Sequence, residues 1–182
     1  MSTITGRKWE RACDACTVCC TALPIETREF RKLPGVACRH LNEQGCAIHA
    51  QRYSVCRAYS CGWQQLDWLD ETWRPDLCGV LISLERRDLP PDYEEGLEFL
   101  VVGGEAAMLT PAFAQAIATA ISKDFATFLA VPGPAKHFSA RVLLNDMVAG
   151  FVSRGDEEGL GDFLRKILRS AEHHCFEPMS EA

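Results

Sequence analysis

The sequence predicts an α+β fold in which a small cysteine-rich module packs on a mixed α/β portion with C-terminal helices. The first observation behind this prediction is a shift in composition, because eight of the ten cysteines lie between Cys13 and Cys61. The same stretch is rich in proline and glycine and lacks long periodic runs, which is typical of irregular structure. The second observation is that the rest of the chain alternates strand-like and helix-like patterns. We therefore divide the chain into residues 1–62 and 63–182, and we expect the two parts to form one compact unit.

The segment after this boundary predicts a connector followed by two strands. Tryptophans recur at five-residue intervals over 63–73, a spacing of neither a helix nor a strand. We expect a short helix or irregular connector that ends at Pro75, with its aromatic rings sealing the two parts together. Apolar and β-branched residues predict strands over 79–85 and 97–104, with Cys78 opening the first as a small buried residue.

The remaining elements follow in the order helix, strand, helix, helix. Pro111 stands after a threonine N-cap, which predicts a helix over 111–122. The run "FATFLAVPG" predicts a third strand over 125–133. A helix is expected over 138–155, ended by a glycine. A last helix is expected after Asp156, which would cap it, because the apolar residues that follow fall on one helical face.

The composition excludes several classes of function. No apolar run is long enough to span a bilayer, so no membrane association is expected. The N-terminal residues "MSTITGRKWERAC" lack the apolar core of a secretory signal, and we expect a cytoplasmic protein in which thiols stay reduced. The net charge is −6, yet residues 1–62 hold nine Lys and Arg against five Asp and Glu. These basic residues form no stripe interleaved with aromatic residues, so no nucleic-acid partner is expected.

The cysteines of the first part follow the spacing C-x2-C-x2-C-C and then C-x7-C-x9-C-x4-C. They are Cys13, Cys16, Cys19, Cys20, Cys38, Cys46, Cys56 and Cys61. Stable disulfides are disfavoured in the expected compartment, and adjacent cysteines are bridged only with strain. A catalytic thiol needs one activated cysteine beside a base, and the strand-to-helix setting of a thioredoxin-like C-x-x-C motif is absent. Metal binding accounts best for so many clustered sulfurs.

Four thiolates complete a zinc tetrahedron or hold an iron–sulfur cluster, so these eight cysteines suffice for one or two centres. The spacing matches neither a ferredoxin half nor paired zinc-ribbon knuckles, which leaves zinc and iron as alternatives. It also leaves open how the cysteines divide between centres and whether His40 or His49 replaces a thiolate. Residues 1–62 would form a metal-stabilised module, because a bound metal supplies the order that such an apolar-poor segment lacks.

The cysteine order resembles the YkgJ-type cysteine-cluster family, whose hallmark is C-x-x-C-x-x-C-C followed by a C-R-x-aromatic-x-C ending. The matching stretches here are "CDACTVCC" and "CRHLNEQGCAIHAQRYSVCRAYSC", and "WRPDLCGVLIS" is similar to the family's R-P-D stretch before a strand. The match covers about residues 13–82. It departs where His49 and the pair Arg52–Tyr53 replace the family's usual tyrosine and Arg-Pro. The resemblance implies chelation of zinc or iron.

A more remote similarity connects such clusters with flagellin lysine N-methylases, which use an iron–sulfur centre. We therefore expect a metal-binding protein that chelates zinc or an iron–sulfur cluster, with a structural role or a role in binding a protein partner. The alternative is an iron–sulfur enzyme in redox or methyl transfer. The sequence carries no clear S-adenosylmethionine site and no residue that we assign as catalytic, and it does not predict an oligomeric state.

Overall fold

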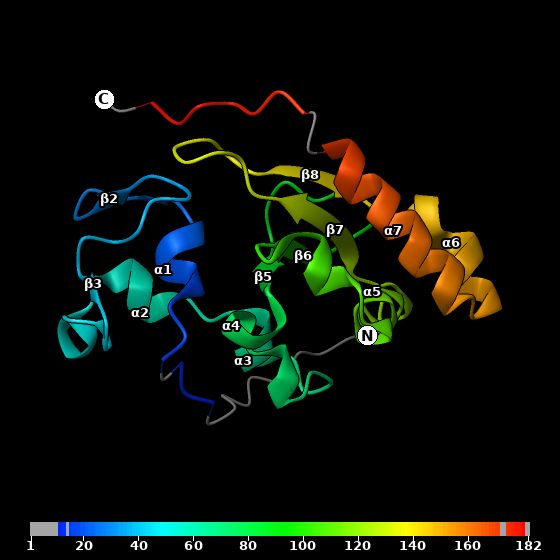
Figure 1. Ribbon diagram of the computed structural model, residues 1–182, viewed down its shortest axis with the longest axis horizontal. Helices are drawn as coiled ribbons and strands as arrows, with labels where there is room; N and C mark the ends of the chain where they lie inside the picture. The colour runs from blue at the N-terminus through cyan, green and yellow to red at the C-terminus, as the bar shows by residue number, and fades with distance from the viewer. Residues whose placement is uncertain (1–10, 14, 172–173, 181–182) are drawn as a thin grey trace.

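The computed structural model describes residues 11–13, 15–171 and 174–180 (Figure 1). Its largest feature is a four-stranded mixed sheet of order β5-β6-β7-β8, in which the central pair is parallel and both outer pairs are antiparallel. The strands are β5 (Val80–Glu85), β6 (Gly96–Val101), β7 (Ala126–Val131) and β8 (Ala140–Leu143). The sheet and the helices below confirm the predicted mixed α/β portion with C-terminal helices.

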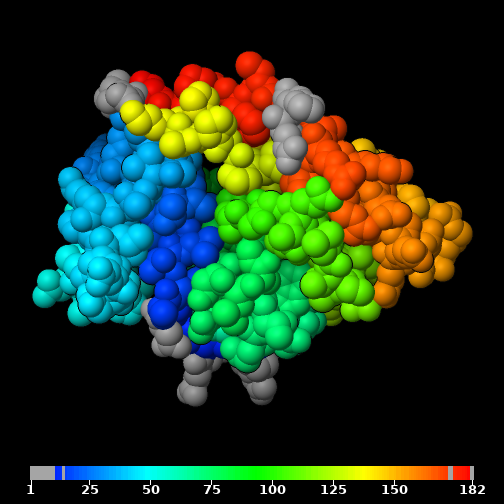
Figure 2. All heavy atoms as spheres, viewed as in Figure 1, coloured from blue at the N-terminus to red at the C-terminus, as the bar shows by residue number. Residues whose placement is uncertain are grey.

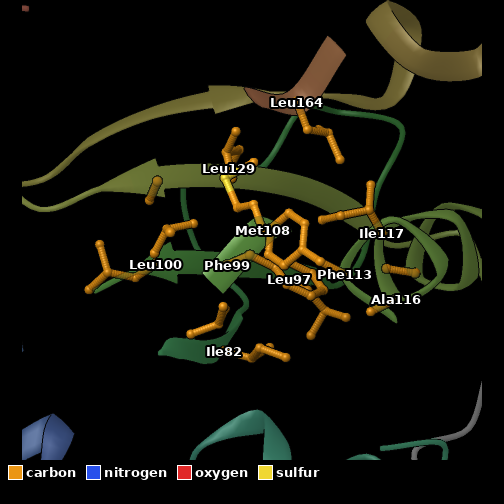
Figure 3. Packing of buried hydrophobic residues seen from close by; sticks show 14 of the residues in the cluster. Ile82, Leu97, Phe99, Leu100, Met108, Phe113, Ala116, Ile117, Leu129 and Leu164 are labelled. Atoms are coloured by element: carbon orange, nitrogen blue, oxygen red, sulfur yellow. The ribbon is translucent and has the colours of Figure 1, made fainter. Parts of the chain in front are cut away.

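Helices cover one face of this sheet. They are the 3₁₀ helix η3 (Gly104–Met108) and the α-helices α5 (Pro111–Ser122), α6 (Asn145–Arg154) and α7 (Glu157–Ala171). Figure 3 shows Phe99 of β6 and Leu129 of β7 packed among Met108, Phe113 and Leu164. The rings of Phe99 and Phe113 meet edge to face, with centroids 6.2 Å apart. Every residue of β7 is buried, as expected for the strand between two others.

Local sequence explains where these helices begin and end. Pro111 occupies the first turn of α5, where a missing backbone N–H costs nothing. Gly155 ends α6 with φ +65°, a conformation that favours glycine. The Asp156 carboxylate accepts the N–H of Gly159 at 2.9 Å and caps α7, which confirms the predicted cap. Asn145 fixes the start of α6 against β7, because its side-chain oxygen accepts the buried N–H of Thr127 at 2.8 Å.

Two predictions about this portion are wrong. The helix expected over 138–155 is instead strand β8 followed by α6, because residues 140–143 pair antiparallel with β7 and extend its sheet. The connector does not end at Pro75. Pro75 opens the short helix α4 (Pro75–Cys78), since a proline is compatible with the first helical turn. Cys78 therefore ends a helix rather than opening a strand, and it is half-buried.

The described residues 11–61 contain only short elements. They are α1 (Val18–Ala22), β1 (Ile25–Glu26), β2 (Arg31–Lys32), β3 (Leu41–Asn42), β4 (Gly45–Cys46), η1 (His49–Gln51) and α2 (Ser54–Ala58). The strands form two separate two-stranded hairpins, β1-β2 and β3-β4. Phe30, Pro34 and Cys61 are the buried apolar side chains among the described residues of this stretch. We call residues 11–61 the cysteine-rich segment, and its internal apolar contacts are few.

A connector joins the cysteine-rich segment to the sheet. It comprises α3 (Gly62–Gln65), η2 (Glu71–Trp73) and α4. Trp63 and Trp73 are buried in the core, and Trp68 is half-buried against it, as expected for aromatic side chains at a junction. Gly62 lies so close to β5 that a Cβ placed on it would come within 2.5 Å of Ile82. In the part of the chain that the structure describes, no helix has the length and apolarity to cross a membrane.

A second connection runs over the top of the molecule. The loop after β7 and the C-terminal segment 174–180 lie side by side and extend from α7 toward β2 (Figures 1 and 2). Lys136 donates its backbone N–H to Pro34 at 2.8 Å, and Met179 donates to Lys136 at 2.8 Å. The Arg31 guanidinium donates to the carbonyl oxygen of Ser180. We call this pair of segments, 132–139 and 174–180, the strap.

Candidate metal centre

Seven of the eight predicted ligand cysteines line one cavity in the cysteine-rich segment. They are Cys13, Cys16, Cys19, Cys20, Cys38, Cys46 and Cys56. Cys61 lines an adjoining, inner cavity beside α3 and β5. The first cavity has a volume of about 140 Å³, well below the roughly 300–1,000 Å³ of pockets that take drug-sized ligands. A space of this size suits ions or a small cluster.

The turn that carries the first four cysteines is fixed by backbone hydrogen bonds. Cys16 donates its N–H to the carbonyl of Cys13 at 2.7 Å, and Cys20 donates to Thr17 at 2.9 Å as α1 begins. Cys19 packs against the apolar core of the sheet portion. Successive residues of a helix point about 100° apart, so Cys20 faces away from that core, toward Lys32 and Arg52.

Cys38 and Cys46 reach the same cavity through the β3-β4 hairpin. Cys38 donates its N–H to the carbonyl of Cys20 at 3.0 Å, which joins two distant parts of the sequence. Leu41 then donates to Cys38 and pairs with Cys46 across the hairpin. The turn is closed by Gly45, whose φ of +107° favours glycine. The spacing of these cysteines is therefore a consequence of hairpin geometry.

Cys13, Cys16 and Cys61 lie next to N–H donors. The Gln64 amide donates to the Cys13 sulfur at 3.3 Å. Backbone N–H groups of Val18 and Asp76 approach Cys16, and those of Gln64 and Trp63 approach Cys61. Burial raises the pKa of Cys61 to about 11, and these N–H groups oppose that rise because they stabilise the thiolate. Donors of this kind orient thiolate ligands and tune the metal that they bind.

The Asp76 carboxylate also lies at Cys16. It is held by Arg74, whose guanidinium donates to both its oxygens at 2.7 and 2.9 Å. The pKa of Asp76 is lowered by these bonds first and also by the Cys16 thiol. Burial raises the pKa of Cys16, and the negative charge of Asp76 adds to the rise. The R-P-D stretch therefore packs directly on the first cysteine turn.

A buried ammonium group stands beside Cys20 and Cys38. Lys32 is only 5% exposed, and its Nζ donates to the carbonyls of Thr21, Leu33 and Val36 at 2.9, 3.2 and 2.9 Å. Burial lowers the pKa of Lys32, and thiolates at Cys38 and Cys20 oppose this. Cysteine spacing carries no signal for this residue, and a lysine in a short strand is usually exposed.

The adjacent Cys19 and Cys20 thiols act on each other. The interaction with Cys20, together with burial, raises the pKa of Cys19. The same interaction lowers the pKa of Cys20, with help from the charges of Lys32 and Arg52. The Arg52 Nε–H is buried and has no hydrogen-bond partner among the described atoms. It is an N–H donor available within the sulfur-lined space.

His40 and His49 both line the larger cavity. His40 lies in an aromatic group with Phe30 and Tyr53, whose rings are stacked with centroids 4.4 Å apart. Its Nε2 lies 3.3 Å from the Tyr53 hydroxyl. His40 therefore has a packing role at the cavity wall, and neither histidine is assigned as a ligand.

The donor set fits a thiophilic metal, although the sulfurs have not converged on one point. The ten cysteines are present as thiols. Within the described ranges, no three Cys, His, Asp or Glu side chains stand close enough to hold an ion. Cys19 instead interacts with Cys20, and Cys16 lies beside the Asp76 carboxylate. Sulfur ligands with N–H and cationic neighbours suit zinc or an iron–sulfur cluster, and binding would require the thiols to lose their protons.

No family model, curated protein or solved structure matches the chain. The resemblance to the YkgJ-type family therefore rests on the quoted cysteine pattern and stays an expectation.

Proposed function

We propose that this chain is a metal-binding protein that chelates zinc or an iron–sulfur cluster through clustered cysteine thiolates. The observation that carries the proposal is the sulfur-lined cavity, to which seven cysteines come from α1, the β3-β4 hairpin, α2 and the turns between them. Residues so far apart in sequence gather their sulfurs where few apolar side chains are buried. A soft metal accounts for both features, because it binds thiolates and supplies folding free energy.

The role proposed for the metal is structural, or it shapes a surface for a protein partner. A four-thiolate site is closed and leaves no position for a substrate. Removing the metal would leave the cysteine-rich segment with Phe30 as its one large buried apolar side chain. That is too little to offset the conformational entropy of some fifty residues, at roughly 1–2 kcal/mol each.

The second candidate is an iron–sulfur enzyme in redox or methyl transfer. One observation favours it: a groove of about 410 Å³ opens beside Cys13 and Cys46 and is lined by His49, Arg52 and Arg57. The groove is large enough for a small molecule, and its basic side chains suit an anion. An iron–sulfur cluster would supply electron transfer there when bound, and the two arginines would bind and orient the anion.

The proposal is tested by purifying the full chain without oxygen and without a metal-affinity column. Bound metals, acid-labile sulfide and the visible spectrum are then measured. Zinc in a colourless protein supports the structural role, whereas iron, sulfide and a brown colour support the second candidate. A protein that binds neither metal, even after reconstitution with each, contradicts both. Cys175→Ser is the matched control, because Cys175 is exposed and lies outside the cavities.

A further inference from the structure

We propose that the groove lined by Arg52 and Arg57 binds a small molecule through a phosphate or carboxylate group. This inference rests on the proposed function and deepens its second candidate, because it names the ligand class of the same groove. The groove has a volume of about 410 Å³ and lies beside Cys13 and Cys46. That volume falls in the roughly 300–1,000 Å³ range of small-molecule sites.

The first observation is the charge of the groove wall. Arg52 and Arg57 contribute two guanidinium groups, and no Asp or Glu is among the described residues that line the groove. Arginines elsewhere in the chain pair with carboxylates, as Arg74 does with Asp76 and Arg86 does with Glu95. Over the described ranges, neither groove arginine has a carboxylate within ion-pairing distance. The positive charge of this wall therefore lacks a carboxylate partner in the described chain.

The second observation is that both arginines keep free hydrogen-bond donors. The Arg52 guanidinium donates to no described residue, and its Nε–H is buried. Arg57 uses its Nη1 to donate to the Arg52 carbonyl, and this bond holds α2 against the turn that precedes it. A guanidinium carries five N–H donors in a planar fork, so donors of both side chains remain for a ligand.

The third observation is that the groove has polar groups that the sulfur-lined cavities do not share. Gln44 of the β3-β4 turn, Arg57 of α2 and Ser60 after α2 line the groove. None of the three lines either cavity in which the cysteine sulfurs gather. Stabilising thiolate charge therefore accounts for Arg52, which lines all three spaces, but not for Arg57.

These features favour one class of ligand. Carboxylate and phosphate groups accept two parallel N–H bonds from a guanidinium, and such charge-assisted bonds are stronger than bonds between neutral groups. An apolar or cationic ligand would leave the two arginines without acceptors, which is unfavourable where a donor is buried. The ligand is therefore expected to place its oxyanion between Arg52 and Arg57, where it is held without a covalent step.

The test is a footprinting experiment on the full chain as purified, in which phenylglyoxal modifies accessible arginines. The probes are inorganic phosphate, pyrophosphate and succinate, and sodium chloride at matched ionic strength controls for screening of charge. Mass spectrometry follows the modification of Arg57 and Arg28 over time. Arg28 is the matched control within the same molecule, because it is exposed, lies in the cysteine-rich segment and lines none of the three spaces.

Modification of Arg57 is expected to slow by roughly fivefold or more with at least one probe, because a bound oxyanion occupies the guanidinium, while Arg28 keeps its rate. Protection by phosphate or pyrophosphate alone identifies a phosphorylated ligand, and protection by succinate alone identifies a carboxylate. Protection by both types means that any oxyanion suffices. No protection, equal protection of Arg28, or equal protection by chloride overturns the inference.

A substitution checks which side chain is responsible. Arg57→Gln removes the charge but keeps an amide donor, and it should weaken binding of the protecting probe by roughly tenfold in equilibrium dialysis. Arg28→Gln makes the same change at the control position and should leave binding unchanged. If the two variants bind the probe equally well, Arg57 does not hold the ligand and the inference is overturned.

Metal content is measured on the same sample, so that the two proposals fail separately. Bound metal without protection of Arg57 overturns the oxyanion site and leaves metal binding in place. Protection of Arg57 in a chain that holds no metal, even after reconstitution, supports the oxyanion site and contradicts metal binding.

Discussion

The two parts of the molecule differ in what fills their interior. From Gly62 onward, the strands and helices bury a continuous apolar core that includes Phe99, Phe113 and Leu164. Each such side chain contributes about 1.5–3 kcal/mol. In the cysteine-rich segment seven cysteines line the cavity, and among its described residues the buried apolar side chains are Phe30, Pro34 and Cys61. The comparison shows that apolar burial accounts for the order of one part, while the proposed metal would supply the order of the other.

The largest effect is expected from metal removal, which should destabilise the cysteine-rich segment and leave the sheet portion unchanged. With a strong chelator, we expect proteolytic cutting within residues 15–60 to accelerate at least tenfold, because the proposed metal would be the main source of folding free energy there. Cutting within residues 80–171 should change little. The sites are mapped by mass spectrometry over time. Equal acceleration in both parts, or in neither, would show that the comparison is wrong.

The second prediction concerns a substitution in the apolar core of the sheet portion. Phe99 is fully buried, and Phe99→Ala is expected to cost about 3–5 kcal/mol in the free energy of unfolding, because the lost ring leaves a cavity. Denaturant unfolding measures this cost. Phe138→Ala, at a position 39% exposed, is the matched control and should cost much less. If Phe99→Ala also loses bound metal at low temperature, in proportion to its loss in free energy of unfolding, the two parts fold as one unit.

The buried lysine tests how far the cysteine-rich segment depends on charge. Lys32→Met keeps much of the side-chain volume but leaves three carbonyls without their donor. Each carbonyl that stays unpaired lowers the free energy of unfolding by about 1–3 kcal/mol. If the chain binds metal as proposed, we expect the metal to transfer to a competing chelator roughly tenfold more readily, as about 1.4 kcal/mol implies. Lys123→Met, at an exposed position, should leave metal retention unchanged.

A smaller effect is expected at the seam between the parts. The Tyr59 hydroxyl lies 3.1 Å from the Ser83 hydroxyl of β5. Tyr59→Phe should cost about 0.5–1.5 kcal/mol, the usual contribution of one hydrogen bond. A double-mutant cycle with Ser83→Ala isolates the pair, and a coupling energy near zero would mean that this contact does not connect the two parts.

The smallest effect concerns two acidic residues on the sheet, Glu98 and Glu85, of which Glu98 is mostly buried. Burial raises the pKa of Glu98, and nearby Glu85 adds to this, while Arg141 opposes it. A carboxyl group whose pKa is higher in the folded state stabilises the fold below its unfolded pKa, and this stabilisation is lost as pH rises through the folded value. Glu98→Gln should therefore flatten the decline in stability from pH 4 upward. The free energy of unfolding of the metal-depleted chain is measured at each pH. If its dependence on pH is the same in Glu98→Gln as in the wild type, the raised pKa of Glu98 is contradicted.

The sequence predicted the apolar part well wherever local preference and tertiary contacts agree. The runs around Phe99 and Leu129 form the central strands, and Pro111 opens a helix as expected. Residues 140–143 were assigned to a helix because their apolar spacing also fits one, and only pairing with β7 makes them a strand. Strand pairing between distant segments leaves little trace in local sequence.

The candidate site was predictable in its residues and not in its arrangement. The spacing from Cys13 to Cys61 identified the sulfurs that line the two cavities. Their grouping depends on contacts that spacing does not encode, such as the bond from Cys38 to Cys20 and the packing of Gly62 on Ile82. The buried Lys32 was missed for the same reason, since its carbonyl partners come together only in the folded chain.

The strap has a consequence for the order of events during synthesis. The cysteine-rich segment is synthesised before Lys136, Met179 and Ser180, which brace it through Pro34 and Arg31. At about 5–20 residues per second, roughly 4 to 24 seconds separate Cys61 from these residues. During that interval the thiols are exposed without their brace. Metal delivery to the nascent chain would have to occur in this window, or wait until the strap has closed.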